Sequence, residues 1–414
     1  MTVERFEVRG GDAEAVAEAV RRLAPAGVSV SGTVSEIIAA VRTRGEPALM
    51  EYVERFDRVD GPLRAEPHEL DAALAQLDPD VRAGLEVAIR NVRTVAEAGV
   101  AEEKVVELPE GQVVTLREVP VRRAAIYTPG GRNAYPSTVV MGVMTARAAG
   151  VEQVVVCAPG AHPVMLAACA LCGADEVWRM GGAHAVAAFA YGTDTVPRVD
   201  VIAGPGSLYV QEAKRQVSGD VGIDGFAGPS DVLILAAGDA DPELVALDLL
   251  AQAEHGAGTV VALVTDDAGL LDAVGRRLDA EAAEMDAAAA LVRVPDLRAG
   301  LAVAEAFAPE HLQLMGAAAE ALAGDVRSAG CVFVGRESAT AFGDYVAGSN
   351  HTLPTGGAAR FASGLSARHF RRRMSVVRVG TAAPALARAG VPIAEAEGFT
   401  RHAASMRVRE NASR

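Results

Sequence analysis

One stretch of the chain, residues 124–217, decides the fold, because short apolar runs alternate there with helical patterns. It reads AAIYT (124–128), STVVMGVMTARAAG (137–150), QVVVCAP (153–159), PVMLAACALCG (163–173), DEVWR (175–179), GGAHAVAAFAYG (181–192), VDVIA (199–203) and SLYVQEAKRQV (207–217). Alternation of this kind is typical of parallel strands joined by crossover helices. The stretch therefore predicts an α/β unit with a parallel sheet.

A second series of the same kind begins near Asp231. Its apolar runs are DVLILAA (231–237), TVVALVT (259–265), ALVRVP (290–295), HLQLM (311–315) and CVFVG (331–335), with helical patterns between them. Neither series has a full G-x-G-x-x-G after its first strand, so the standard dinucleotide fingerprint is absent. The expected fold class is thus α/β with two incomplete Rossmann-like parallel-sheet units.

The flanks of the chain have a different texture. Residues 11–27 form a short amphipathic helical pattern, Thr33 and Glu36 have the spacing of a capping box, and a longer helix is expected over 79–98. After Ser363 the strand–helix rhythm stops, and the arginine-rich run at 368–373 suggests a solvated or interface face. We expect an N-terminal helical arm and a small C-terminal helical module.

Composition narrows the class of protein. The chain has 414 residues, half of them apolar, so it is long enough for more than one core. Its 39 basic and 54 acidic residues give a net charge of −15, which argues against nucleic acid or an anionic membrane surface as partner. The start of the chain has no apolar signal region, and the uncharged stretch 153–174 is interrupted by a turn. A cytoplasmic protein without a membrane span is expected.

Two glycine-rich loops each follow an expected strand and precede an expected helix. They are TPGGRN (128–133) and AGPGS (203–207). Glycines at such a turn let the backbone approach an anion, and the helix N-terminus favours negative charge. Either loop fits a dinucleotide phosphate, and each fits a tight strand–helix turn equally well.

Histidines and carboxylates supply the other candidates. Gln252 and His255 are three residues apart at the end of an expected helix, so they share a helical face and suit a metal such as zinc. Glu310 and His311 are adjacent and suit general acid–base chemistry. The residues alone leave open whether either pair is functional.

Two further pairs lie toward the C-terminus. Asp344 and His351 fall in FGDYVAGSNHTLPTGG, a loop whose composition is common at functional sites. Glu397 and His402 are five residues apart, a spacing that does not by itself place them on one helical face. Cys169 and Cys172 form a C-x-x-C inside an alanine-rich helical pattern and are interpreted as small core residues.

An ordered set of segments resembles the histidinol dehydrogenase family. The segments are IYTPGG, AYPSTVVM, GGAHAVAAFAYGT, GPGSLYVQEAKRQV, GPSDVLI, QAEHG, PEHLQL, GDYVAGSNHTLPTGG and FASGLSARHF. The resemblance runs from about Val119 to His402 and more weakly through the N-terminal helices. It implies a zinc- and NAD-dependent enzyme of histidine biosynthesis, an oxidoreductase.

The resemblance also implies roles for particular residues. Glu310 and His311 match the catalytic pair. The positions that match zinc ligands are Gln252, His255, Asp344 and His402, and the substrate-binding set adds Ser230, His311, His351 and Glu397 to these four. Tyr127 matches a residue that contacts the nucleotide. The family usually has glutamine at the position of His184 and asparagine at that of Ser207, so the cofactor role of these two is open.

Members of the family are homodimers in which the C-terminal module reaches the partner subunit. The resemblance therefore implies that Glu397 and His402 complete the site of a neighbouring subunit. The expected domains are an N-terminal arm (1–25), a first Rossmann-like domain with the zinc and catalytic residues (26–125 and 232–365), a second on the nucleotide side (126–231), and a C-terminal module that reaches the partner (366–414).

The implied reaction is the NAD-dependent four-electron oxidation of L-histidinol through histidinal to L-histidine. One zinc per subunit would orient the substrate, His311 would be the general base, and Glu310 would activate water. Three alternatives are a dehydrogenase of the same scaffold that acts on another amino alcohol or polyol, a zinc hydrolase without nicotinamide, and a binding protein without catalysis. A thioester route is disfavoured because no cysteine lies in the matched catalytic segments.

Overall fold

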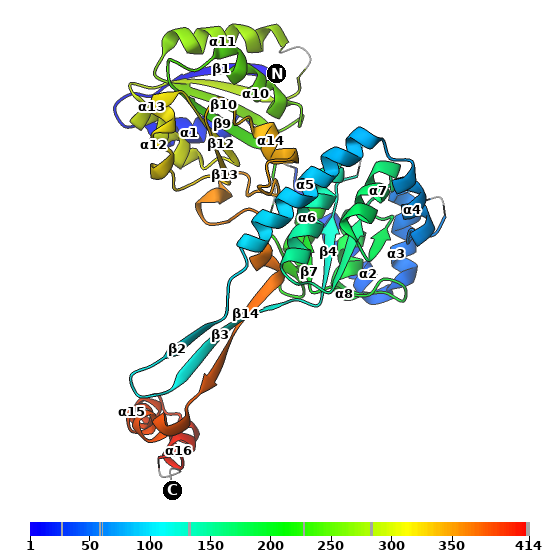
Figure 1. The fold of residues 1–414 in the computed structure, drawn as a ribbon, viewed down its shortest axis with the longest axis vertical. Helices are drawn as coiled ribbons and strands as arrows, with labels where there is room; N and C mark the ends of the chain where they lie inside the picture. The colour runs from blue at the N-terminus through cyan, green and yellow to red at the C-terminus, as the bar shows by residue number, and fades with distance from the viewer. Residues whose placement is uncertain are drawn as a thin grey trace. The chain divides into compact units, whose positions relative to one another are not determined.

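The computed structural model describes residues 1–25, 28–57, 59, 61–130, 134–226, 228–281 and 285–410. The chain divides into two compact units (Figure 1). The first comprises Met1–Gly99 and Arg122–Phe370, and the second comprises Val100–Val121 and Arg371–Arg414. Residues 131–133 of the first glycine-rich loop lie outside the described residues.

A six-stranded parallel sheet forms one half of the first unit. Its strands, in spatial order, are β1 (Thr2–Glu7), β11 (Ala288–Arg293), β10 (Val260–Thr265), β9 (Asp231–Ala236), β12 (His311–Met315) and β13 (Cys331–Val334). The central strands β9 and β10 are mostly apolar and are buried along their whole length, because helices cover both faces. The second predicted strand–helix series is therefore confirmed as a parallel sheet.

Helices pack on both faces of this sheet. One core joins the sheet to α10 (Pro242–Ala253) and α11 (Ala268–Glu281), and the other joins it to α1 (Ala13–Arg21) and α12 (Leu297–Phe307). The shorter helices α13 (Ala317–Glu320) and α14 (Thr340–Tyr345) follow β12 and β13. Helices on both sides bury every position of the inner strands β9, β10 and β12.

A five-stranded parallel sheet forms the other half. Its spatial order is β6 (Glu176–Trp178), β5 (Gln153–Cys157), β4 (Arg123–Tyr127), β7 (Val201–Ala203) and β8 (Gly222–Ile223). The crossover helices are α6 (Pro136–Ala148), α7 (Pro163–Cys172), α8 (Gly182–Tyr191) and α9 (Leu208–Val217). Cys169 and Cys172 are buried and unbridged on α7, as the sequence predicts.

The N-terminal helices correct the predicted domain boundaries. They are α2 (Ser31–Arg44), α3 (Glu46–Tyr52), the π-helical turn η1 (Val53–Asp57), α4 (Pro67–Ala75) and α5 (Pro79–Ala98). They pack on the helices of the five-stranded sheet, α2 on α8 and α9, α4 on α7, and α5 on α6. The prediction grouped 26–125 with 232–365, whereas these helices contact the helices of the five-stranded sheet. An amphipathic pattern shows that a helix has a buried face but does not name the sheet it covers.

Two local predictions at the start of the chain also change. Residues 1–25 are not a purely helical arm, because Thr2–Glu7 is the edge strand β1 and pairs in parallel with β11. This strand was not predicted because it is an exposed edge strand in which polar and apolar residues alternate, so it has no continuous apolar run. The helix expected from the capping-box spacing of Thr33 and Glu36 begins earlier, at Ser31.

The second unit is a three-stranded antiparallel sheet with two helices. The order is β14 (Arg371–Arg378), β3 (Val113–Pro120) and β2 (Lys104–Glu107), followed in the chain by α15 (Ala383–Ala396) and α16 (Thr400–Arg407). The module predicted as helical over 366–414 thus contains a strand and takes two more from residues 104–120. Arg373 of the arginine run forms an ion pair of 2.5 Å with Glu118 across β14 and β3.

Short 3-10 turns complete the fold. They are Ala323–Asp325, Ala358–Arg360, Ala367–Phe370 and Gly380–Ala382. Among the described residues, no helix is both long and apolar enough to span a membrane.

Candidate active site

The predicted catalytic pair lies where two neighbouring strands begin. Glu310 directly precedes β12 and His311 opens it, while Ser230 directly precedes β9. Since β9 and β12 are adjacent and parallel, their amino ends meet at one edge of the six-stranded sheet. The fold therefore brings residues 80 positions apart in sequence to hydrogen-bond distance.

Glu310 is held by a closed set of hydrogen bonds. Its Oε2 accepts from the Ser230 hydroxyl and, at 3.1 Å, from the backbone N–H of Asp231. In return, the backbone N–H of Glu310 donates to Asp231 Oδ1 at 2.6 Å. Burial, together with the neighbouring Asp231 carboxyl, outweighs the lowering effect of His311 and raises the pKa of Glu310 to about 7. A carboxyl with such a pKa exchanges protons near neutral pH.

His311 faces carboxylates on two sides. Its Nδ1 is 3.7 Å from Glu310 Oε2 and 3.3 Å from the Asp231 carbonyl oxygen, and its Nε2 is 3.6 Å from Asp344 Oδ1. Burial lowers the pKa of His311, but Asp344 and Glu310 outweigh it and raise the pKa to about 9. The imidazole therefore carries a proton near neutral pH as long as Asp344 remains its partner.

Asp344 connects the remaining predicted residues. Burial acts to raise its pKa, yet His311, His351 and His255 together lower the pKa below its ordinary value. The backbone oxygen of Asp344 lies 2.9 Å from His351 Nδ1, whose Nε2 lies 3.2 Å from the Thr138 hydroxyl. Three histidines thus favour the charged form of one carboxylate.

Gln252 closes the cluster from α10. Its side chain is buried and its amide nitrogen donates to the Ser230 hydroxyl, which leaves the amide oxygen unused by that bond. His255 follows at the end of the same helix and is solvent-exposed. In the described part of the chain, no three His, Cys, Asp or Glu side chains gather in a metal-binding group.

Seven of the predicted catalytic, metal-binding and substrate-binding residues therefore lie in the first unit. They are Ser230, Gln252, His255, Glu310, His311, Asp344 and His351. Glu397 and His402 belong to the second unit, where both are exposed, Glu397 at the end of α15 and His402 on α16. His402 packs edge-on against Phe399, with 5.2 Å between the ring centres.

The predicted nucleotide residues lie at the carboxyl edge of the five-stranded sheet. Tyr127 ends β4, and its hydroxyl accepts the Gly182 N–H at 2.9 Å. His184 is buried on α8, its Nε2 lies 2.8 Å from Asp57 Oδ2, and its ring stacks on Tyr52. Ser207 is exposed at the start of α9 and makes no capping hydrogen bond with its side chain.

Two residues near the catalytic pair were not singled out from the sequence. Asp231 contacts both members of the pair, and its own burial raises its pKa to about 6. Cys331 opens β13 opposite His311, and burial raises the pKa of its thiol. Asp231 follows Ser230 in the GPSD segment, so its position was a usable signal. Cys331 has no signal in sequence because only strand pairing brings it to the site.

Comparisons with known proteins show the family of the chain. The family model described as histidinol dehydrogenase matches residues 21–410. A histidinol dehydrogenase of Parasynechococcus marenigrum (strain WH8102) is 44% identical over 399 residues, with 92% of this chain and 91% of the relative covered. One of Rhizobium meliloti (strain 1021) is 41% identical, with 92% of each covered.

A solved structure gives the same result. The crystal structure of histidinol dehydrogenase from Elizabethkingia anophelis superposes with a TM-score of 0.92 at 28% identity, over 100% of this chain and 98% of that one. Together, the α/β fold and the family match define an enzyme of the oxidoreductase class. The chain belongs to the histidinol dehydrogenase family, which confirms the resemblance seen in the sequence.

Proposed function

We propose that this enzyme oxidises L-histidinol through histidinal to L-histidine, with NAD as acceptor and one zinc ion per subunit. The observation that carries the proposal is the connected cluster of Ser230, Glu310, His311 and Asp344 at the amino edge of the six-stranded sheet. Family membership favours histidinol over another amino alcohol or polyol.

The catalytic pair suits two successive oxidations. His311 would take the proton of the substrate hydroxyl as hydride leaves for NAD, which supplies the hydride acceptor when bound. Glu310, whose pKa is about 7, would then take a proton from the water that adds to the aldehyde. Its hydrogen bonds from Ser230 and Asp231 keep the carboxyl oriented between these steps.

The donor set is chemically suited to zinc. Gln252 offers an amide oxygen, His255 an imidazole nitrogen and Asp344 a carboxylate, a mixed set of the kind that zinc accepts. Zinc would supply a fixed point for the substrate's nitrogen atoms and has no redox role. A carboxylate engaged in this way no longer favours a protonated His311, so His311 would be free to accept a proton.

The nucleotide is better accommodated on the five-stranded sheet, and helix capping gives the reason. At the carboxyl edge of the six-stranded sheet, Asp241, Asp267 and Asp296 accept backbone N–H groups at the starts of α10, α11 and α12. Carboxylates in these places repel a further anion. In the described part of the five-stranded sheet, α6 and α9 start without a side-chain cap.

These two helices follow β4 and β7, which are neighbours from which the chain departs in opposite directions. Such a switch point is where doubly wound sheets bind ligands. We therefore infer that each sheet is an incomplete Rossmann-like unit and that NAD lies across the carboxyl ends of β4 and β7, near Tyr127.

A cysteine thioester is an unfavourable route for the aldehyde step even though Cys331 lies near the site. Burial raises the pKa of its thiol, and the Asp344 charge acts in the same direction. A nucleophilic cysteine needs its pKa lowered. Glu310 and water remain the better-supported means of oxidising the aldehyde.

The test is NADH formation by the purified, zinc-loaded enzyme with L-histidinol. The proposal predicts about two NADH per histidinol consumed, because each of the two hydride transfers reduces one NAD. Removal of zinc by a chelator should abolish turnover, and zinc addition should restore it. Clean turnover of another alcohol without turnover of histidinol would reassign the substrate, and ester or amide hydrolysis without NAD would favour a zinc hydrolase.

A shared site would explain why Glu397 and His402 lie in a separate unit. We propose a homodimer in which His402 of one subunit is the fourth zinc ligand of the other and Glu397 contacts its substrate. A His402→Ala chain and a His311→Gln chain should each be inactive alone and should recover about a quarter to a half of wild-type activity when mixed and refolded together. Absence of recovery in verified mixed dimers would place His402 in its own subunit's site.

A further inference from the structure

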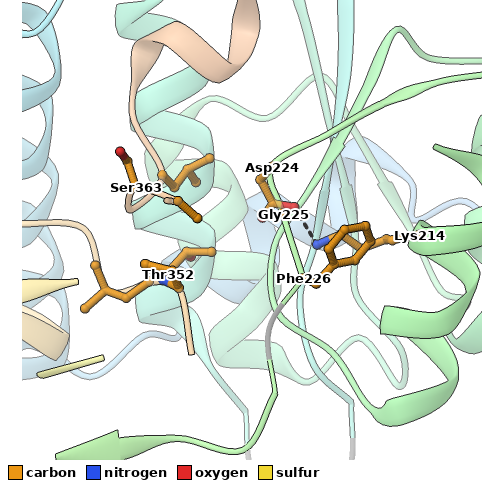
Figure 2. Close-up of a pocket in the computed structure, with 10 residues that line it drawn as sticks. Lys214, Asp224, Gly225, Phe226, Thr352 and Ser363 are labelled. Carbon is orange, nitrogen blue, oxygen red and sulfur yellow. Dashed lines mark ion pairs between the residues drawn. The ribbon is translucent and has the colours of Figure 1, made fainter. Parts of the chain in front are cut away.

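Lys214 and Asp224 form a buried ion pair that the proposed chemistry does not use. The side chains are only 1% and 5% exposed, and Lys214 Nζ lies 2.5 Å from Asp224 Oδ1 (Figure 2). Lys214 comes from α9 and Asp224 directly follows β8. Two charges are expensive to remove from water, so a pair at this depth calls for a reason beyond stability.

Both charges are bonded to the same glycine. The N–H of Gly204 donates to Asp224 Oδ2 at 2.7 Å, and Lys214 Nζ donates to the Gly204 carbonyl oxygen at 2.9 Å. Gly204 has a φ of +122°, a backbone conformation that L side chains rarely adopt. The ion pair therefore fixes the two peptide groups that flank Gly204 in the 203–207 loop.

The orientation of Gly204 determines what surrounds it. A methyl group on its Cα would come within 2.0 Å of the Tyr127 carbonyl oxygen, and one on Gly206 within 3.1 Å of the Tyr127 ring. The loop is thus packed on Tyr127 while it leads into the uncapped start of α9. A rotation of the Gly204 peptides would move both Tyr127 and the first backbone N–H groups of α9.

The ion pair is also shielded from solvent on the side of Lys214 and Asp224 that faces a cavity. It adjoins a cavity of about 30 Å³, room for little more than a water molecule. Phe226, Thr352 and Ser363 are among the other residues that line it (Figure 2). In such surroundings hydrogen bonds to charged groups are strong, so the loop is held firmly before any ligand arrives.

We propose that Lys214 and Asp224 are positioning residues that hold the 203–207 loop in the shape that receives the pyrophosphate of NAD. Neither side chain touches the cofactor. This inference rests on the proposed function, since it needs NAD to bind across β4 and β7. It predicts that loss of the pair weakens nucleotide binding and leaves the acid–base steps intact.

The test measures NADH binding directly. Trp178, the chain's one tryptophan, ends β6 in the same sheet, so energy transfer from Trp178 to NADH reports binding without turnover. Lys214→Met should raise the Kd for NADH about tenfold or more, the equivalent of one lost hydrogen bond to a charged group. With NAD raised to saturation, kcat for histidinol should stay within about threefold of wild type. Lys214→Arg, which keeps the charge and a donor, should recover part of the affinity.

Two further variants separate positioning from stability. Lys214→Met/Asp224→Asn leaves no unpaired charge inside and should fold where the single variant fails, with the same loss of NADH affinity. Arg123→Met breaks another buried ion pair of the same sheet, at its amino edge, where Arg123 and Glu176 are 2.5 Å apart. It should lower the thermal midpoint but leave the Kd for NADH unchanged.

The results distinguish the two proposals. A Lys214→Met or double variant with a lower thermal midpoint and wild-type NADH affinity would show that the pair is merely structural. Absence of NADH binding by the wild-type, zinc-loaded enzyme would overturn the proposed cofactor and this inference with it.

Discussion

In the two parallel sheets of the first unit the strands of each series follow the same spatial order, but the candidate site residues lie at opposite edges. In each, the first strand of the series is central, the next two lie to one side and the following two to the other. In the six-stranded sheet, Ser230, Glu310 and His311 gather at the amino edge. In the five-stranded sheet, Tyr127 and the 203–207 loop lie at the carboxyl edge. Topology alone therefore does not say where a site forms.

The two sheets differ in how the helix starts at their carboxyl edges are capped. Aspartates cap the helices that leave the six-stranded sheet, which satisfies their N–H groups and places negative charge there. In the five-stranded sheet, glycines with tight packing replace those caps after β7. This difference in local sequence at the strand ends is what supports our proposal that acid–base chemistry belongs to one sheet and nucleotide binding to the other.

The largest expected effect comes from the amino edge of the six-stranded sheet. His311→Gln and Glu310→Gln should each lower kcat for histidinol oxidation roughly 100- to 10,000-fold, the usual range for a lost acid–base group. Glu310→Gln should impair histidinal oxidation more than the first step, because only the second step needs an activated water. NADH formation from histidinol and from histidinal, measured separately, checks both statements.

The Kd for NADH is the control for this prediction. It should not change, since neither substitution alters the five-stranded sheet. If either variant retains a kcat within about threefold of wild type, the substituted residue takes no part in the acid–base steps.

The next effect concerns the carboxyl edge of the five-stranded sheet. Gly204→Ala places a methyl group 2.0 Å from a backbone oxygen at a φ of +122°, so it should destabilise the protein by about 3 kcal/mol or more and abolish NADH binding. Gly160→Ala, after β5 on the same edge, has a φ of +74° but meets nothing within 4 Å. It should cost about 1 kcal/mol and keep NADH affinity.

Thermal unfolding followed by circular dichroism, together with the NADH titration, compares the two glycine variants. Equal losses of stability would mean that the conformation of Gly204, and not its close packing on Tyr127, is what requires glycine.

The smallest expected effect concerns whether the buried Glu310 carboxyl lowers the stability of the protein. The pKa of Glu310 is raised from 4.5 to about 7 in the folded protein. The contribution of this carboxyl to the free energy of unfolding is therefore fully present below about pH 4.5. It is lost as the pH rises through about 7, because the unfolded chain releases this proton more readily. In metal-free protein, Glu310→Gln should raise the thermal midpoint at pH 8 by about 2–5 °C and change it less at pH 5.

Glu36→Gln is the matched control, since Glu36 is exposed on α2. A midpoint for Glu310→Gln that equals wild type at both pH values would contradict the unfavourable burial of this carboxyl.

Much of the site was predictable because its residues are chemically distinctive. Glu310 and His311 are adjacent in sequence, Gln252 and His255 share a helical face, and ordered motifs identified the family. The N-terminal boundaries were less predictable, because α2 to α5 show amphipathic patterns that fit either sheet. The strands of the second unit were missed since β2 and β14 are mostly exposed and lack continuous apolar runs.

The sequence by itself determined the α/β class, the two strand–helix series and the family, because periodicity and motif order are local properties. Only the tertiary structure showed that Asp231 contacts both catalytic residues and that Lys214 and Asp224 hold one glycine. The physical reason is strand pairing: neighbouring parallel strands bring distant residues to a shared edge, and no local pattern specifies which residues meet there.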